Sequence, residues 1–274
     1  VAGMFLYGPP RNGKSTLARR MTNCFVQYIW IPRTIVEDGQ IIKLYDAACH
    51  QARKSDDGEA FDHGEYDKRW VQVRRPTVVV GGEVTMDSLV LRHDTMSNVC
   101  EATLKMKSKG GCLMIDDFGR QRIEPRELLN RWIIPLENRQ DFLTLPTGKK
   151  IQVPFDQLII FSTNLDPATL GDEAFLRRIP YKIEITDPSD EEFHRLFEMY
   201  AREHRCPYRR DAVEHLLQKH FRSHGRPQRR CQPRDLLSLI ANLCRYNGLP
   251  MEMREDYFDR VEHSYFTSDG SGAL

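Results

Sequence analysis

The chain has 274 residues, and its 40 lysines and arginines almost balance its 39 aspartates and glutamates. The resulting net charge of +1 gives no global bias towards nucleic acid or an anionic membrane. Apolar residues make up 40% of the chain and charged residues 29%, which excludes wholesale disorder and fits a globular protein with room for two domains.

The cysteines and the apolar runs narrow the class of protein further. The seven cysteines have no CxxC spacing, so we expect neither a disulfide framework nor a zinc ribbon. Reduced cysteines are typical of a cytoplasmic protein, which is the location that we expect. The longest apolar runs are about five residues, whereas a membrane span needs about 20, so the sequence predicts no span.

The first half of the chain mixes one helix with strand-like segments. The pattern of apolar and polar residues predicts a strand at residues 4–7, a helix from Lys14 to about Tyr28, and a polar surface loop at residues 51–68. From Thr77 to Met106 apolar and polar residues alternate, which indicates a β-ribbon. Because only one short strand precedes the first motif, we also expect further sequence upstream of Val1.

The sequence of the second half predicts strands at Cys112–Ile115, Leu158–Phe161 and Tyr181–Ile185. It also predicts a helix at Pro125–Glu137 and a hairpin at Phe142–Val153. Strands that alternate with helices predict an α/β fold with a mostly parallel sheet. Ser189, followed by three acidic residues, is a helix start signal, and helical spacing then recurs three times, at residues 212–221, 235–246 and 255–265. We therefore expect an α/β domain at residues 1–187, a helical domain at 188–267 and a disordered tail at 268–274.

A phosphate-binding loop follows the first predicted strand. The pattern GxxxxGK[ST] is matched by Gly8, Pro9, Pro10, Arg11, Asn12, Gly13, Lys14 and Ser15. Its glycines let backbone N–H groups turn towards phosphate oxygens, Lys14 can reach the β- and γ-phosphates, and Ser15 can bind Mg²⁺. A chance glycine turn is the alternative, and the strand–loop–helix setting disfavours it.

Two later strands end in polar side chains. Asp116 and Asp117 follow the strand at residues 112–115, and Asn164 follows the strand at residues 158–161. Ligands of open α/β sheets bind at the carboxyl ends of the strands. Asp116 would hold Mg²⁺, Asp117 would polarise an attacking water, and Asn164 could orient that water. Each is an ordinary strand end when taken alone, but together with the phosphate loop they favour a nucleotide site.

Taken in order, the segments GPPRNGKS, CLMIDD, FSTN, AFLRR and QPRDLL resemble the AAA+ ATPases, and the resemblance covers nearly the whole chain. It implies a three-layer P-loop NTPase domain followed by a helical lid, with ATP bound by residues 8–15 and Thr16. Its motifs match, in chain order, Lys14 and Ser15 as Walker A, Asp116 and Asp117 as Walker B, Asn164 as sensor 1, Arg178 as the arginine finger with Arg177 as its fallback, and Arg234 as sensor 2 of the lid.

The segment at residues 142–151 looks like the pre-sensor 1 hairpin of the clade that holds magnesium chelatases, MoxR proteins and enhancer-binding activators. The period-two stretch at residues 77–106 is similar to the insertion in the second helix of that clade. The GAFTGA loop of the activators is absent, so the activator interpretation is disfavoured. Two positions depart from the family: Asp117 stands where Glu is usual, and Arg11 stands where Gly is common.

The resemblance implies an Mg²⁺-dependent ATPase that forms a homo-oligomeric ring, expected to be a hexamer, and that remodels an unidentified protein partner. Two alternatives stay open. The short carboxylate of Asp117 motivates a nucleotide switch that hydrolyses ATP weakly. Nine lysines and arginines at residues 205–234 motivate a DNA- or RNA-dependent translocase, although a solvated or intersubunit face is the favoured interpretation of that segment.

Overall fold

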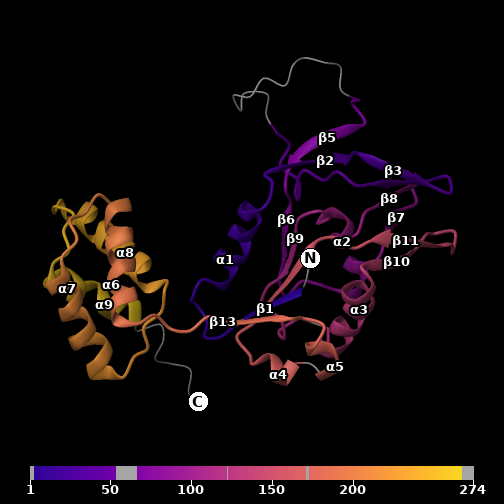
Figure 1. Ribbon diagram of the computed structural model, residues 1–274. Helices are drawn as coiled ribbons and strands as arrows, with labels where there is room; N and C mark the ends of the chain where they lie inside the picture. The colour runs from indigo at the N-terminus through magenta and orange to yellow at the C-terminus, as the bar shows by residue number, and fades with distance from the viewer. Residues whose placement is uncertain (1–2, 54–66, 122, 171–172, 267–274) are drawn as a thin grey trace. The chain divides into compact units, whose positions relative to one another are not determined.

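The computed structural model describes residues 3–53, 67–121, 123–170 and 173–266 (Figure 1). The chain divides into two compact units, which we describe separately. An α/β unit consists of residues 1–8 and 14–185, and a helical unit consists of residues 9–13 and 186–274. Among the described residues, no helix is long and apolar enough to cross a membrane.

The α/β unit is built on five parallel strands in the spatial order β13-β1-β12-β9-β6. These strands are β1 (Gly3–Tyr7), β6 (Thr77–Val80), β9 (Cys112–Ile115), β12 (Leu158–Ser162) and β13 (Tyr181–Glu184). The predicted strands at residues 4–7, 112–115, 158–161 and 181–185 are therefore confirmed. A parallel sheet whose strands follow one another only through crossovers is the α/β architecture that the sequence predicts.

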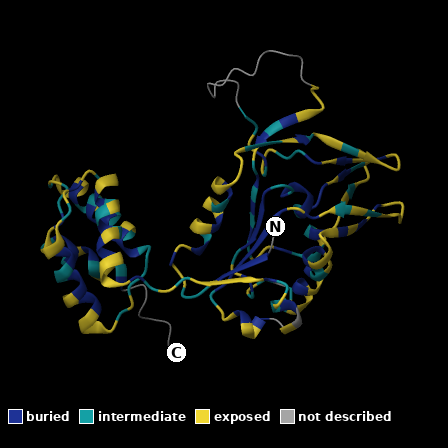
Figure 2. Cartoon of the chain, in the orientation of Figure 1, coloured by how far each residue is buried: buried dark blue, intermediate teal, exposed yellow. Residues whose placement is uncertain are grey.

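The two faces of the sheet pack against different helices, which makes the unit a three-layer sandwich. Alternate residues of β1 and β12, such as Phe5 and Phe161, join one apolar cluster with Trp132 of α3 (Pro125–Asn138). The residues between them, such as Leu6, join a second cluster with Ala18 of α1 (Lys14–Met21). Because both faces are covered, the central strands are almost continuously apolar and buried (Figure 2).

The first helix is shorter than the sequence predicts. It ends at Met21, a 3₁₀ turn follows at η1 (Thr22–Cys24), and β2 (Tyr28–Pro32) begins where the helix was expected to end. The Thr22 hydroxyl contacts the Thr77 hydroxyl at 2.8 Å, beside the start of β6. This tertiary contact and the weak helix propensity of Thr and Asn explain the early end.

The predicted β-ribbon at residues 77–106 is only partly correct, because β6 belongs to the central sheet. A separate four-stranded sheet has the order β3-β4-β8-β7, and β2 pairs with β5 in a two-stranded sheet. The bounds are β3 (Thr34–Glu37), β4 (Gln40–Lys43), β5 (Trp70–Arg74), η2 (Met86–Leu89), β7 (Arg92–Asp94) and β8 (Val99–Glu101). After residue 102 the alternation of apolar and polar residues predicts a strand, and this prediction is wrong, because residues 104–107 are helical. The Thr103 hydroxyl accepts a hydrogen bond from the Met106 N–H and caps the short helix α2 (Leu104–Lys107).

The hairpin lies where the sequence predicts it, between α3 and β12. Its strands are β10 (Gln140–Thr144) and β11 (Lys150–Pro154). The buried Asp141 of β10 accepts hydrogen bonds from Lys105 of α2 at 2.9 Å and from Arg131 of α3 at 2.6 Å. Burial lowers the pKa of Lys105 to about 8, and the neighbouring Asp141 opposes this shift. These ion pairs fix the base of the hairpin to both helices.

The helical unit contains α6 (Asp190–Glu203), α7 (Arg210–Leu216), the π-helical turn η3 (Leu217–Phe221), η4 (Arg222–His224), α8 (Gln232–Asn247) and α9 (Glu255–Phe266). The predicted start of α6 is confirmed as a capping box, in which the Ser189 hydroxyl and the Glu192 carboxylate each bond the other's backbone N–H. Four buried phenylalanines form much of its core: Phe193, Phe197, Phe221 and Phe258. The predicted surface loop lies largely, and the predicted tail wholly, outside the described residues.

Gly111, just before β9, lies in close contact with Pro76, just before the neighbouring strand β6, and this contact generates a stability prediction. A Cβ at this position would lie 2.1 Å from the Pro76 carbonyl oxygen, which accepts the Cys112 N–H. Gly111→Ala should therefore lower the free energy of unfolding in urea by about 2–4 kcal/mol. Gly82→Ala is the matched control, because its nearest neighbour would be 3.9 Å away. Equal stability of the two variants would show that β9 tolerates a shift away from β6.

Candidate functional site

The phosphate loop and the two polar strand ends meet at one edge of the central sheet. Because β1, β12 and β9 are parallel neighbours, their carboxyl ends share that edge. Gly8 follows β1, Asp116 follows β9, and Asn164 lies two residues after β12. The fold therefore gathers the residues that the sequence predicts from three separate segments.

The Lys14 ammonium is held between two of these strand ends. Lys14 is buried, with 7% of its surface exposed. Its Nζ atom donates hydrogen bonds to the Gly8 carbonyl oxygen at 2.8 Å and to Asn164 Oδ1 at 2.7 Å. The cation is thus fixed at the first turn of α1, beside the residue predicted to be sensor 1.

A hydroxyl and a carboxylate form a second contact at this edge. Ser15 Oγ donates a hydrogen bond to Asp116 Oδ2 at 2.7 Å, and the Asp116 N–H donates to the Val80 carbonyl oxygen at 2.7 Å. Oxygen donors of this kind suit Mg²⁺, which prefers carboxylates and waters and few other protein ligands. The oxygen donors of Ser15 and Asp116 therefore fit the chemistry of the cation that the sequence predicts.

The loop turns sharply at Gly8, and only glycine fits there. Its φ of 122° lies outside the region open to other residues, and a Cβ would meet the Ile185 carbonyl oxygen at 2.5 Å. The Ile185 N–H also donates to the Tyr7 carbonyl oxygen at 2.8 Å. The backbone at Gly8 thus lies close to the backbone at Ile185, and the chain turns here into the loop whose N–H groups would face a phosphate.

The tip of the loop, Pro9–Gly13, belongs to the helical unit. Asn12 donates to Asp187 at 2.6 Å and accepts from the Arg230 N–H at 3.0 Å. The Arg11 carbonyl oxygen accepts the Cys231 N–H at 3.2 Å. Arg11 has a φ of 64°, the left-handed conformation that glycine adopts most readily.

Asp117 also has a left-handed backbone, with a φ of 49°. The Gln121 side chain supports this turn by donating to the carbonyl oxygens of Asp116 and Asp117 at 3.0 and 3.1 Å. Among residues other than glycine, Asp and Asn tolerate this conformation best. The backbone conformation therefore gives a physical reason for Asp at a position where the AAA+ ATPases that the sequence resembles usually have Glu, and the exposed Asp117 carboxylate is open to water.

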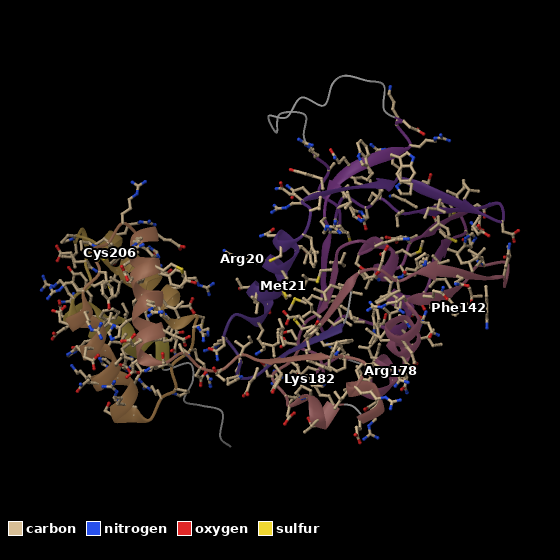
Figure 3. All side chains as sticks on the ribbon, viewed as in Figure 1. Arg20, Met21, Phe142, Arg178, Lys182 and Cys206 are labelled. Atoms are coloured by element: carbon tan, nitrogen blue, oxygen red, sulfur yellow. The ribbon has the colours of Figure 1, made fainter. Side chains whose placement is uncertain are left out.

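Two of the three predicted arginines, Arg178 and Arg234, pair with acidic side chains outside this cluster. Arg178 follows α5 (Glu173–Leu176), has 18% of its side chain exposed, and pairs with Glu137 of α3 at 3.2 Å (Figure 3). Arg177 and Thr16 are exposed. Arg234 lies in the helical unit and pairs with Asp235 at 2.8 Å. The structure thus joins Lys14, Ser15, Asp116 and Asn164, whereas the roles of the arginines stay predictions.

One group of potential ligands in the helical unit was not predicted from the sequence. His215 and His220 contact the same carboxylate, Asp259. Their five-residue spacing does not match an α-helical face, and Asp259 is about 40 positions away in the chain, so neither periodicity nor a local motif indicated them.

Comparison with solved structures identifies the fold. NtrX from Brucella abortus in complex with ADP matches with a TM-score of 0.57 and 17% identity over 93% of this chain, and a second NtrX structure matches at 0.55 and 18%. A point mutant of RuvB from Thermotoga maritima matches at 0.53 and 13% over the whole chain and 65% of its own length. The chain spans about half the length of NtrX, at 49%. The chain therefore shares the fold of NtrX and RuvB, an α/β unit with a central parallel sheet followed by a helical region.

The sequence comparisons add one match. The family model "Domain of unknown function (DUF8689)" matches residues 189–264, which are α6 to α9 of the helical unit. No curated protein sequence matches the chain.

The conformation of Asp117 generates a stability prediction. Asp117→Glu should cost about 1 kcal/mol of unfolding free energy, because a longer side chain without the local bonding of Asp tolerates a left-handed backbone less well. Asp117→Asn is the matched control and should change the stability by less than about 0.5 kcal/mol. Urea unfolding measures both variants. A Glu variant as stable as the Asn variant would contradict a backbone reason for aspartate.

Proposed function

We propose that the chain binds ATP with Mg²⁺ and hydrolyses it, as a subunit of a ring-forming ATPase that remodels a protein partner. The observation that carries this proposal is the convergence of three strand ends on the phosphate loop. There, Lys14 contacts Asn164 and Ser15 contacts Asp116 at hydrogen-bond distance. The ADP complex of NtrX, which has the same fold, is consistent with a nucleotide ligand.

Each residue of the site has a role that follows from its chemistry. The Lys14 ammonium would contact the β- and γ-phosphates, where charge-assisted hydrogen bonds are strong. Ser15 and Asp116 would hold Mg²⁺, which when bound neutralises charge on the phosphate oxygens. Asp117 would orient the attacking water and accept its proton, and Asn164 would help to position that water. In the reaction, the water oxygen forms a bond to the γ-phosphorus. The bond between the γ-phosphorus and the oxygen that bridges it to the β-phosphate breaks, which yields ADP and phosphate.

A ring follows from the proposed role of Arg178. An arginine supplied by one subunit to the nucleotide of its neighbour stabilises the charge that develops on the transferred phosphoryl group. Within one chain, the Arg178–Glu137 pair is half exposed on the glutamate side, and such pairs contribute at most about 1 kcal/mol to stability. Breaking this ion pair would therefore cost little by itself when Arg178 contacts a phosphate. A hexamer and a protein substrate remain the expectation from the family resemblance.

The two alternatives differ in their support. The left-handed Asp117 favours the weakly hydrolysing switch as a second candidate, because its short carboxylate reaches less far than that of glutamate. The translocase is disfavoured, because most basic side chains of residues 205–234 pair with acidic side chains of the same unit. These paired residues are Arg209, Lys219, Arg222, Arg226, Arg229, Arg230 and Arg234. Single-turnover hydrolysis with and without DNA or RNA separates the three candidates.

Lys14→Ala tests nucleotide binding directly. Removing the ammonium should weaken binding of a fluorescent ATP analogue at least tenfold, or about 1.4 kcal/mol. The matched control is Arg20→Ala, which removes an exposed positive charge from the same helix (Figure 3). Equal affinities of the two variants would contradict a phosphate-binding role for Lys14.

Arg178→Ala tests the ring. It should reduce hydrolysis by about 10³–10⁵-fold, the range found for arginine fingers. Mixed with the inactive Lys14→Ala chain, it should regain activity, because some interfaces then combine an intact loop with an intact finger. Steady-state phosphate release from the mixture, with native mass spectrometry to confirm mixed assemblies, measures this recovery.

The matched control is Glu137→Gln, which breaks the same ion pair but keeps the arginine. If Arg178 only supports the fold, both variants should lose similar stability and activity. If it acts on a neighbouring nucleotide, Glu137→Gln should hydrolyse ATP normally. Mixed assemblies that remain inactive would count against a role in trans.

A further inference from the structure

A π-helical turn in the helical unit places two histidines on one side. His215 lies on α7 and His220 lies on η3, the π turn that continues from it. Residues five apart in an α-helix point about 140° away from each other, because each residue rotates the helix by about 100°. In a π turn, hydrogen bonds join residues five apart, so their side chains align. Such turns are rare and often occur at functional sites.

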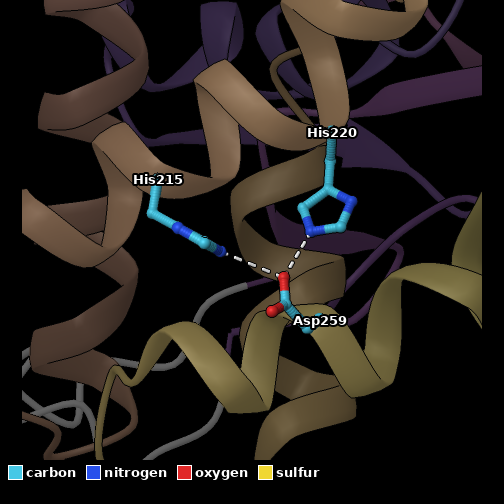
Figure 4. Close-up of side chains that lie close together, drawn as sticks. All are labelled: His215, His220 and Asp259. Carbon is cyan, nitrogen blue, oxygen red and sulfur yellow. Dashed lines mark hydrogen bonds and ion pairs between the residues drawn. The ribbon is translucent and has the colours of Figure 1, made fainter.

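Both imidazole rings meet Asp259 of α9 (Figure 4). His220 Nε2 lies 2.6 Å and His215 Nε2 lies 3.1 Å from Asp259 Oδ1. The three ligand atoms all lie within 4.8 Å of one another. The His220 side chain is 8% exposed, and those of His215 and Asp259 are 24% and 32% exposed. The cluster is therefore shielded on one side and accessible to solvent on the other.

A second carboxylate lies behind each ring. Glu255 Oε2 is 3.4 Å from His215 Nδ1, and Glu262 Oε2 is 3.7 Å from His220 Nδ1. Both glutamates lie on α9, one turn on either side of Asp259. A carboxylate at the ring nitrogen opposite the ligating one is the usual support of a metal-binding histidine, because it fixes the orientation of the ring and raises its basicity. Here a glutamate lies within ion-pair distance of that nitrogen at both histidines.

We propose that His215, His220 and Asp259 form a binding site for a divalent transition-metal ion, with Zn²⁺ as the best fit. Two imidazole nitrogens and one carboxylate oxygen are a donor set that zinc uses, with water in the fourth position. Tetrahedral zinc holds such atoms about 3.3 Å apart, given bonds of about 2.0–2.1 Å. Each ring would need to move from Asp259 Oδ1 by less than about 1 Å, and the two ring nitrogens, which lie within 4.8 Å of each other, would also need to reach this spacing.

The site would cross-link the helical unit. The two histidines belong to the α7–η3 segment and the aspartate to α9, so one ion would connect two segments about 40 residues apart in the chain. A ligand that binds only the folded state stabilises that state by mass action. Lys219 opposes binding, because its Nζ lies 2.8 Å from Asp259 Oδ2. Asp259 is therefore expected to bind the ion through Oδ1 alone.

The first test is cobalt binding to the full chain after treatment with a chelator. Co²⁺ should give the visible absorption bands of a tetrahedral site at one equivalent per chain, and Zn²⁺ should displace it and raise the thermal unfolding midpoint. His220→Gln and Asp259→Asn should each weaken binding at least tenfold. His263→Gln, an exposed histidine of the same helix α9, is the matched control and should bind normally.

Lys219→Gln separates the metal site from an ordinary ion-pair cluster. Removing the ammonium should tighten Co²⁺ binding at the proposed site, because a positive charge no longer opposes the ion. In an ion-pair cluster, the variant would lose stability and gain no affinity. The proposal is overturned if the wild-type chain shows neither cobalt bands nor stabilisation by zinc, or if Asp259→Asn, folded by circular dichroism, binds as tightly as wild type.

Discussion

The buried ammonium of Lys14 constrains much of the α/β unit. Removing a cation from water costs several kcal/mol unless polar partners replace the solvent. Two of its partners are the Gly8 carbonyl oxygen, at the end of β1, and the Asn164 side chain, beyond the end of β12. Both are in reach only because β12 is the parallel neighbour of β1, with Leu6 opposite Ser162, and because the chain turns at Gly8. The strand order, the register and the turn at Gly8 are thus all required for the contacts of the Lys14 ammonium.

The central sheet and its site could be predicted from the sequence because their signals are local and strong. Strands buried on both faces must be continuously apolar, so the apolar runs of β1, β9 and β12 predict these strands. The residue that follows such a strand must lie at the carboxyl edge of the sheet. Asp116 and Asn164 could therefore be predicted to lie beside Lys14 without knowledge of the strand order, since all parallel strands have their carboxyl ends at the same edge of the sheet.

The errors arise where a tertiary contact or a side-chain bond overrides the local pattern. The first helix ends early at Met21, where Thr22 turns to meet Thr77 on another strand, a partner that no local pattern indicates. After residue 102, one hydroxyl-to-backbone bond at Thr103 starts a helix within an apolar–polar alternation. The pair of His215 and His220 could not be predicted from the sequence, for a related reason. A π turn changes the residues that share a face, and sequence periodicity assumes a regular helix.

The two proposed cation sites differ in donor chemistry, and this difference keeps them independent. Ser15 and Asp116 offer oxygen ligands only, which suit a hard ion that keeps most of its waters. His215 and His220 offer imidazole nitrogens, which bind zinc far better than magnesium. Mg²⁺ at the concentrations that support ATP binding would therefore not fill the histidine site. Zinc at low concentration would bind the histidines first, because two imidazole nitrogens and a carboxylate outweigh one carboxylate and a hydroxyl. Zinc, and not the magnesium that accompanies ATP, is thus expected to change the stability of the helical unit.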